Sequence, residues 1–205
     1  RLGTSVAFCG RLGLDSIGES FQTLMKSRLV NLHGLQIDSQ RPSRVVLVRR
    51  DSKGERSFQG FAGDTGNGFA DQSLAVGDLI DAWPLLEVNA RWLLIGTIPL
   101  ATSSSSEAYL WSIDRSLSKN IEIALDVNWR PTFWDVNSKP DSGPDKKTMA
   151  KIAVVLEKIS LLKLAKEEAI WFFNSQDPSE ISRSLSKRPD VVVTDGAKPL
   201  KWMIG

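Results

Sequence analysis

Short apolar segments alternate with amphipathic ones through the second half of the sequence, and this alternation constrains the fold most. Four apolar segments are typical of buried strands: RWLLIG (91–96), IEIALDVN (121–128), SLLKL (160–164) and DVVVT (190–194). Four others have helical spacing: SSEAYLWSIDRSL (105–117), DKKTMAKIAVVLEK (145–158), AKEEAIWFF (165–173) and DPSEISRSL (177–185). Strands separated by helices form βαβ units. The chain is therefore predicted to be an α/β protein with a mostly parallel sheet between helices.

The first half of the chain is less regular. A strand is predicted at residues 6–9, followed by a glycine-rich turn, GRLGLDSIG (10–18), and a helix in SFQTLMKSRLV (20–30). The segments SRVVLVRRD and ERSFQGF predict a hairpin that turns at SKG. The hairpin does not fit the alternation, so we expect a small separate sheet within residues 40–63. A helix is predicted at 74–86, and PLKWMIG (199–205) is predicted to begin a second hairpin.

Composition narrows the possible partners and reaction types. The net charge is +2 and the basic residues are scattered, which predicts neither a nucleic-acid partner nor a membrane one. No apolar run approaches the roughly 18 residues of a membrane span. The single cysteine, Cys9, excludes an internal disulfide, favours a reducing, cytoplasmic location and is predicted to be a buried structural thiol. Because the sequence has one histidine, His33, and one cysteine, a His/Cys metal site is nearly excluded. His33 is predicted to lie in a loop with a solvated side chain.

Polar groups that suit an anion follow three successive predicted strands. They are Asn128 and Arg130 in DVNWRP, Lys163 and Glu168 in LKLAKEEA, and Thr194 and Gly196 in VVVTDGAK. The carboxyl ends of parallel strands open on one edge of a sheet, where ligands bind in open α/β folds. Each group also has a structural alternative. Arg130 could pair with Asp126 or Asp135, and Glu168 could cap its helix.

Two glycine-rich segments are weaker candidates. GRLGLDSIG could cradle a phosphate, but its spacing matches neither GxGxxG nor the P-loop, which favours a tight turn that starts a helix. AGDTG (62–66) follows the first hairpin, and no convincing helix start comes after it. We therefore interpret Asp64 as a loop residue.

Taken in their order along the chain, several of these segments resemble motifs of the ribokinase-like (PfkB) carbohydrate kinases, and of fructokinases in particular. Gly10, Gly13, Asp15 and Gly18 resemble the family's GxxGxDxxG stretch, and RRDSKGERSFQGF resembles the hairpin that forms its lid. DVNWRPTFW is similar to a DxNxR element, LLKLAKEEAIWFF to the segment with the N-x-x-E motif, and VVVTDGAK to the T-x-G motif. The resemblance extends over nearly all 205 residues.

The resemblance implies an ATP-dependent kinase that phosphorylates a sugar hydroxyl, with fructose as the first expectation and Mg²⁺ as the metal. It implies that Arg130 contacts the sugar or the transferring phosphoryl group, and that Phe58 and Gly60 of the lid lie near the sugar. Four residues would contact the phosphates or the nucleotide: Asn128, Lys163, Thr194 and Gly196. Glu168 would order the water shell of Mg²⁺. A homodimer through the lid is a further expectation.

The sequence also departs from the family pattern. Ala165 stands where Asn, Ser or Thr is usual, and Pro199 replaces the small residue after T-x-G-x-K. The C-terminal GAGD motif, which supplies the catalytic base, and the N-terminal glycine-rich sugar-binding stretch are absent from the sequence. We expect one ribokinase-like domain over 1–205, truncated at both ends, whose base is unknown and which is inactive alone. The alternative is a non-catalytic sugar- or nucleotide-binding member that acts as a regulatory or structural partner, which Ala165 slightly favours.

Overall fold

The computed structural model describes residues 3–50, 56–139 and 141–205. The chain forms two compact units. The first is Arg1–Asn89 with Thr102–Ser112, and the second is Ala90–Ala101 with Ile113–Gly205. Helix α3 (Ser103–Ser118) contributes to both. Among the described residues, no helix combines the length and apolar character needed to cross a membrane.

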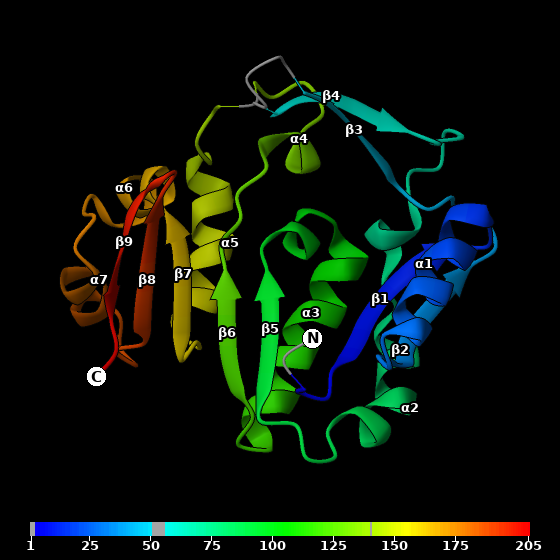
Figure 1. Cartoon of the computed structure of the whole chain (residues 1–205), viewed down its shortest axis with the longest axis horizontal. Helices are drawn as coiled ribbons and strands as arrows, with labels where there is room; N and C mark the ends of the chain where they lie inside the picture. Colours follow the sequence, from blue (N-terminus) through cyan, green and yellow to red (C-terminus); the bar gives the residue numbers. More distant parts are fainter. Residues whose placement is uncertain (1–2, 51–55, 140) are drawn as a thin grey trace. The chain divides into compact units, whose positions relative to one another are not determined.

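The first unit begins with a βαβ unit made of β1 (Ala7–Gly13), α1 (Ser16–Ser27) and β2 (Asn31–Asp38) (Figure 1). β1 and β2 pair in parallel. β1 runs through Gly10, so the predicted strand was too short and the predicted turn too long. The loop predicted around His33 is wrong, because this residue lies in β2, although its ring is exposed as expected. Burial raises the pKa of the Cys9 thiol to about 11, so the thiol is protonated at neutral pH.

Asp15 holds together the connection between β1 and α1. Its Oδ1 accepts a hydrogen bond from the backbone N–H of Gly18 (2.8 Å), and its Oδ2 accepts one from that of Ser43 (2.6 Å). The N–H of Gly13 donates to the Ser43 hydroxyl (2.9 Å). A Cβ on Gly18 would lie 2.3 Å from the carbonyl oxygen of Gly13, so this close approach requires glycine. These contacts support a structural role for GRLGLDSIG as a helix start.

The predicted hairpin is confirmed as a separate antiparallel pair, β3 (Val45–Arg50) and β4 (Arg56–Ala62). Its predicted SKG turn lies outside the described residues. Arg44, just before β3, ties the hairpin to the segment that follows it. The guanidinium lies over the rings of Phe61 (4.6 Å) and Phe69 (4.5 Å) and pairs with Asp71 at 3.0 Å. The hairpin is therefore anchored at its base.

The segment after the hairpin is a loop that leads into η1 (Ala70–Ser73) and α2 (Val76–Leu86). Asp64 lies in this loop, as predicted. Its Oδ1 accepts hydrogen bonds from the backbone N–H groups of Gly66 (2.8 Å) and Gly68 (3.0 Å). These bonds close the loop on itself. The first helix after the loop is the short 3₁₀ helix η1.

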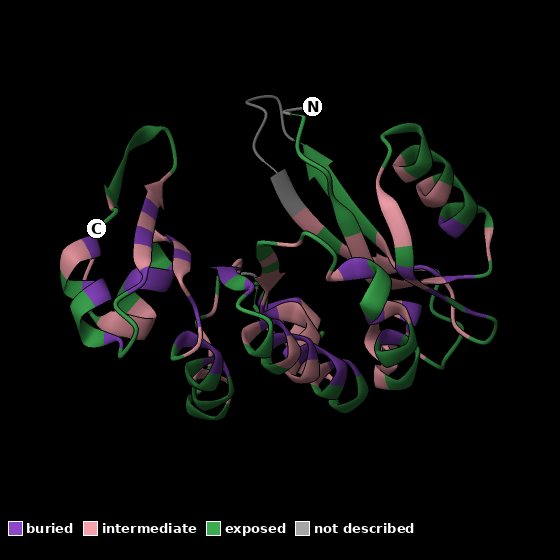
Figure 2. Cartoon of the chain, turned by 90° about the horizontal axis from the view of Figure 1, so that it is seen from below, coloured by how far each residue is buried: buried purple, intermediate pink, exposed green. Residues whose placement is uncertain are grey.

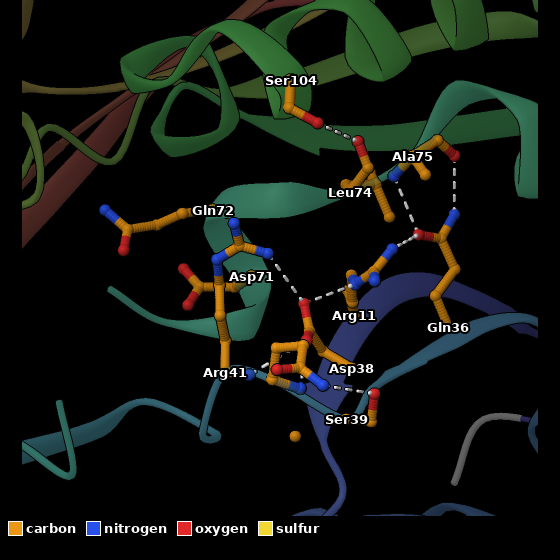
Figure 3. Close-up of polar contacts among 12 residues, drawn as sticks. Arg11, Gln36, Asp38, Ser39, Arg41, Asp71, Gln72, Leu74, Ala75 and Ser104 are labelled. Atoms are coloured by element: carbon orange, nitrogen blue, oxygen red, sulfur yellow. Dashed lines mark hydrogen bonds and ion pairs between the residues drawn. The ribbon is translucent and has the colours of Figure 1, made fainter. Parts of the chain in front are cut away.

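A buried polar network joins β1, β2 and the start of α2 (Figure 3). Asp38 is only 2% exposed, and its Oδ2 accepts from Arg11 (3.0 Å) and Arg41 (3.3 Å). Gln36 exchanges two hydrogen bonds of 2.8 Å with the backbone of Ala75. Burial favours a raised pKa for Asp38, but hydrogen bonds from Gln40 and Arg41 and the charge of Arg11 outweigh it, so its pKa is lowered.

The second unit contains a five-stranded sheet in the order β5-β6-β7-β8-β9 (Figure 1). Its strands are β5 (Trp92–Gly96), β6 (Glu122–Asp126), β7 (Leu161–Ala165), β8 (Asp190–Asp195) and β9 (Lys198–Met203). The first four are parallel, and β9 runs antiparallel to β8, as the hairpin prediction required. The connecting helices are η2 (Ile98–Ala101), α3, α4 (Pro131–Trp134), α5 (Lys146–Leu156), α6 (Lys166–Phe173) and α7 (Pro178–Ser184). The predicted α/β class with a mostly parallel sheet is confirmed.

The two faces of this sheet differ in burial. Buried and less buried residues alternate along its strands (Figure 2). On one face the apolar side chains are fully or almost fully buried: Ile123, Leu125, Leu162, Leu164, Val191 and Val193. Ile152 of α5 and Ile181 of α7 are also fully buried and belong to the same core. On the alternate positions, Trp92 (51%), Leu94 (74%) and Trp202 (65%) are exposed. The main core of the second unit therefore lies on one face of the sheet.

Asp15→Ala is expected to lower the free energy of unfolding by about 1–3 kcal/mol at pH 7, because two backbone N–H groups lose their acceptor. Burial favours a raised pKa for Asp15, but the hydrogen bonds from Ser43 and Gly18 outweigh it and lower the pKa. Asp15 therefore stabilises the fold above its unfolded pKa of about 3.9, and this contribution is lost as the pH falls through the folded value.

Urea unfolding of the wild type and of Asp15→Ala at several pH values measures this effect. The difference between the two should shrink between about pH 5 and pH 3. Asp81→Ala, on the exposed face of α2, is the control and should change stability by less than about 0.5 kcal/mol at any pH. A difference that stayed constant with pH would show that the ionised Asp15 is not the stabilising species.

Candidate functional site

The carboxyl ends of β6, β7 and β8 form one edge of the sheet in the second unit. Asp126 pairs in register with Lys163, and Ala165 pairs with Thr194. The second-unit residues singled out in the sequence lie on these strand ends or directly after them: Asn128, Arg130, Lys163, Glu168, Thr194 and Gly196. Arg130 and Thr194 therefore belong to the same edge, as predicted.

Asn128 and Arg130 form the turn between β6 and α4. Asn128 has a φ of +43°, a left-handed conformation that Asn tolerates better than most residues. Arg130 is exposed, and its Nη1 donates to the carbonyl oxygen of Trp129 (2.8 Å). Within the described part of the chain, Arg130 forms no ion pair with Asp126 or Asp135. The alternative of a surface ion pair is therefore not found, and most of its donors are available to an anion.

Glu168 joins two strand–helix connections. It is 4% exposed, its Oε1 accepts from the backbone N–H of Trp129 (2.5 Å), and its Oε2 accepts from that of Ala165 (2.6 Å). The second bond caps α6, so the capping alternative is confirmed. The first bond fixes Trp129, the residue before Arg130, relative to α6. A carboxylate has about four lone-pair sites, so Glu168 keeps acceptor capacity for water.

Charged side chains form ion pairs at this edge. Lys163 lies 3.0 Å from Oδ1 of Asp126. Oδ2 of Asp195 lies 3.1 Å from Nζ of Lys198 and 3.6 Å from Nζ of Lys166. The hydrogen bond from Lys198 is the main cause that lowers the pKa of Asp195, and the charges of both lysines add to it against the effect of burial.

Thr194 and Gly196 lie where β8 ends. Thr194 is half-buried. Its hydroxyl lies 3.4 Å from the carbonyl oxygen of Leu164, which is a long and therefore weak hydrogen bond. Gly196 has a φ of +55°, and a Cβ there would meet no atom within 4 Å, so its backbone is accessible. Pro199 lies in the edge strand β9, next to a shift in register, where proline is tolerated. The hairpin therefore forms despite this departure from the family pattern.

Phe58 and Gly60 belong to the first unit. The Phe58 ring packs edge-on against Phe61, with centroids 5.0 Å apart. Gly60 has a φ of +120° and lies at the bulge where the register with β3 shifts. The structure thus explains why β4 has a glycine here. The approach of Phe58 and Gly60 to a sugar stays a prediction.

The comparison with known families agrees with the resemblance of the motifs. The sequence profile described as pfkB family carbohydrate kinase matches residues 1–203. The chain belongs to this family.

Its relatives include several fructokinases. The chain is 26% identical to the fructokinase of Vibrio alginolyticus over 209 residues, which cover all of the chain and 61% of that protein. It is 23% identical to the probable chloroplastic fructokinase-6 of Arabidopsis thaliana, of which it covers 50%. The chain thus spans about half to three fifths of these relatives' length.

Solved structures of this family have the same fold. The fructokinase of Vibrio cholerae O395 in its apo form superposes with a TM-score of 0.75 at 25% identity. The match covers all of this chain and 67% of that one. The fructokinase of Xylella fastidiosa with bound ATP superposes with a TM-score of 0.78 at 24% identity, over 99% of this chain and 61% of that one. The ribokinase-like architecture is therefore shown.

Glu168→Ala is expected to lower the free energy of unfolding by about 2–5 kcal/mol, because the N–H groups of Trp129 and Ala165 lose their acceptor. Glu167→Ala is the matched control. This neighbour lies in the same helical turn but is exposed, and its loss should cost less than about 0.5 kcal/mol. Chemical denaturation measures both. Equal effects of the two substitutions would contradict a bridging role for Glu168.

Ala165→Ser is expected to raise the free energy of unfolding by about 0.5–1 kcal/mol. Ala165 is the N-cap of α6, with extended backbone (φ −74°, ψ 159°) and no side-chain hydrogen bond. A serine hydroxyl there can accept from the N–H of Glu168, which completes the capping box. Ala153→Ser is the control. Ala153 is exposed and lies in the middle of α5, so this substitution should instead lower the free energy of unfolding by a few tenths of a kcal/mol. A destabilised Ala165→Ser protein would refute this account of the cap.

Proposed function

We propose that the chain is part of an ATP-dependent sugar kinase that transfers the γ-phosphoryl group of ATP to a hydroxyl of fructose. The observation that carries this proposal is the single sheet edge at which three strand ends present anion-binding groups. The named relatives support the substrates. Many are fructokinases, one structural neighbour has bound ATP, and another, from Vibrio cholerae O395, has fructose, ADP and a calcium ion.

The residues at this edge suit phosphoryl transfer, which depends mainly on positioning and on stabilising charge. In the proposed reaction, the bond from the γ-phosphorus to the bridging oxygen breaks as a bond to the sugar oxygen forms. Arg130 donates hydrogen bonds to the transferring group, and Asn128 and Lys163 hold the phosphates. Thr194 and Gly196 contact the nucleotide, while Phe58 and Gly60 close over the sugar. The sugar proton passes to a base that none of these residues supplies.

The acidic groups at this edge fit a magnesium ion held mainly by nucleotide phosphates and water. Mg²⁺ commonly binds through one or two carboxylates with substrate phosphates and retained waters. Glu168 would order such waters through its remaining lone pairs, and Asp126, part-exposed beside Lys163, would lie near them. No cluster of three acidic, His or Cys residues occurs among the described residues, so a metal cage built by the protein alone does not fit. The ion would supply neutralisation of phosphate charge.

Two further proposals follow from the family. A homodimer through the lid is supported by the exposure of Val46, Leu47 and Val48 on β3. A cytoplasmic location is supported by the single cysteine, which suits a reducing compartment. The second candidate function, a non-catalytic sugar- or nucleotide-binding protein, is favoured by Ala165, which brings no polar side chain to the start of α6.

An ADP-release assay with fructose, on this chain and on a full-length protein that contains it, tests the proposal. We expect fructose-dependent turnover only by the full-length protein, and a loss of kcat/KM of at least about tenfold in its Arg130→Gln variant. No turnover with any sugar by the full-length protein would favour the non-catalytic alternative. Turnover by the short chain that Asp64→Ala abolishes would show that the loop carboxylate is the base.

A further inference from the structure

A mainly apolar groove lies between α5 and the ends of α6 and α7 in the second unit. Its volume is about 660 Å³. Helix α6 contributes the partly exposed rings of Trp171, Phe172 and Phe173, and α5 contributes the exposed side chains of Ala150 and Ala153. Aromatic side chains along a groove that is open to solvent are typical of an interaction surface.

The residues of α5 along this groove form a row with a symmetric pattern. Ala150, Ala153 and Glu157 line the groove, and Lys146 continues the same side of the helix by one turn. The four residues are four, three and four positions apart, which is the spacing of side chains on one helix face. All four are exposed. The row therefore has two small residues at its centre and opposite charges at its two ends, with the same spacing from either end.

Neither charge at the ends of this row is neutralised by an ion pair. In the described ranges of the chain, Lys146 and Glu157 form none, and Glu157 accepts hydrogen bonds from the N–H and the hydroxyl of Ser186. Lys158, which follows Glu157, is already paired with Asp114. The row therefore favours a partner helix that brings a negative charge to Lys146 and a positive charge to Glu157.

We propose that this groove is an interface between two copies of the chain, in which α5 of one copy packs antiparallel to α5 of the other. A two-fold axis through the centre of the row places Lys146 against Glu157 of the partner subunit and Ala150 against Ala153 of the partner subunit. Each pair then occurs twice. The charges favour a second copy as the occupant, because the row is complementary to itself in this orientation. The alanines let the two helices approach closely, and antiparallel helices have opposed dipoles.

This contact differs from the proposed homodimer through the lid. It involves residues of the second unit, whereas the lid contact involves β3 of the first. One helix and one groove from each copy form an interface smaller than the roughly 1,600 Å² of a standard one. We therefore expect a reversible dimer with a dissociation constant on the order of 10 µM.

Sedimentation equilibrium of the folded chain, at concentrations from about 1 to about 200 µM, measures the association. All samples carry Leu47→Lys on the exposed part of β3, so that the lid contact does not contribute. Lys146→Glu and Glu157→Lys should each weaken the dimer at least about tenfold, because two attractive pairs in each dimer become repulsive. Lys151→Glu is the control. Lys151 is exposed on α5 but lies outside the row, so its substitution should leave the affinity unchanged.

A mixture of the two charge variants is the sharpest test of the antiparallel pairing. A dimer of one Lys146→Glu chain and one Glu157→Lys chain again has opposite charges at both ends of the contact. The equimolar mixture should therefore regain the affinity of the parent chain to within about threefold, although each variant alone dimerises poorly. Circular dichroism melting establishes that each variant is folded. Ala150→Arg, which blocks the close approach at the centre of the row, replaces a charge variant that is not.

Three results would overturn the proposal. One is a parent chain that stays monomeric at about 200 µM. Another is a dimer whose affinity the folded Lys146→Glu, Glu157→Lys or Ala150→Arg variants leave unchanged, as the Lys151→Glu control does. The third is a mixture of the two charge variants that associates no better than either alone, because the antiparallel pairing requires the mixed dimer to form.

Discussion

The geometry of the sheet edge depends on the buried carboxylate of Glu168. One oxygen accepts from the N–H of Trp129, which precedes Arg130, and the other from that of Ala165, the N-cap of α6, 36 positions later in the chain. The parallel pairing of β6, β7 and β8 brings these connections to one edge. Pairing alone leaves the loops after the strands free to vary. Glu168 removes that freedom, because releasing either N–H would leave a buried donor without an acceptor.

The first unit uses the same physical device. Asp15 binds the N–H groups of Gly18 and Ser43, and Asp38 binds those of Gln40 and Arg41. In each case an ionised carboxylate accepts backbone donors and fixes a connection between secondary-structure elements. The hydrogen bonds favour the charged form strongly enough to lower the pKa of Asp15 and Asp38 despite burial. The sheet edge of the second unit and the turns of the first are therefore held by similar chemistry.

Periodicity predicted most of the second unit, because its strands and helices bury residues at regular spacing. It missed β2, where Gly34 and the exposed His33 interrupt the apolar pattern. The positions of Asn128, Arg130 and Thr194 followed from strand order and could be predicted. The pair between Lys166 and Asp195 could not, because it joins side chains 29 residues apart. The bond from Trp129 to Glu168 spans 39 residues and has no local signal either.

On the proposed function, anion binding and catalysis would be separable on this architecture. The groups that would hold phosphates follow β6, β7 and β8, and their arrangement is maintained by Glu168 and by ion pairs within the second unit. Removal of the sugar proton needs a base at hydrogen-bond distance from the attacking hydroxyl, and no residue at this edge is assigned that task. On the proposed function, nucleotide affinity would therefore depend on this unit, whereas turnover would also require contacts to the sugar and a base.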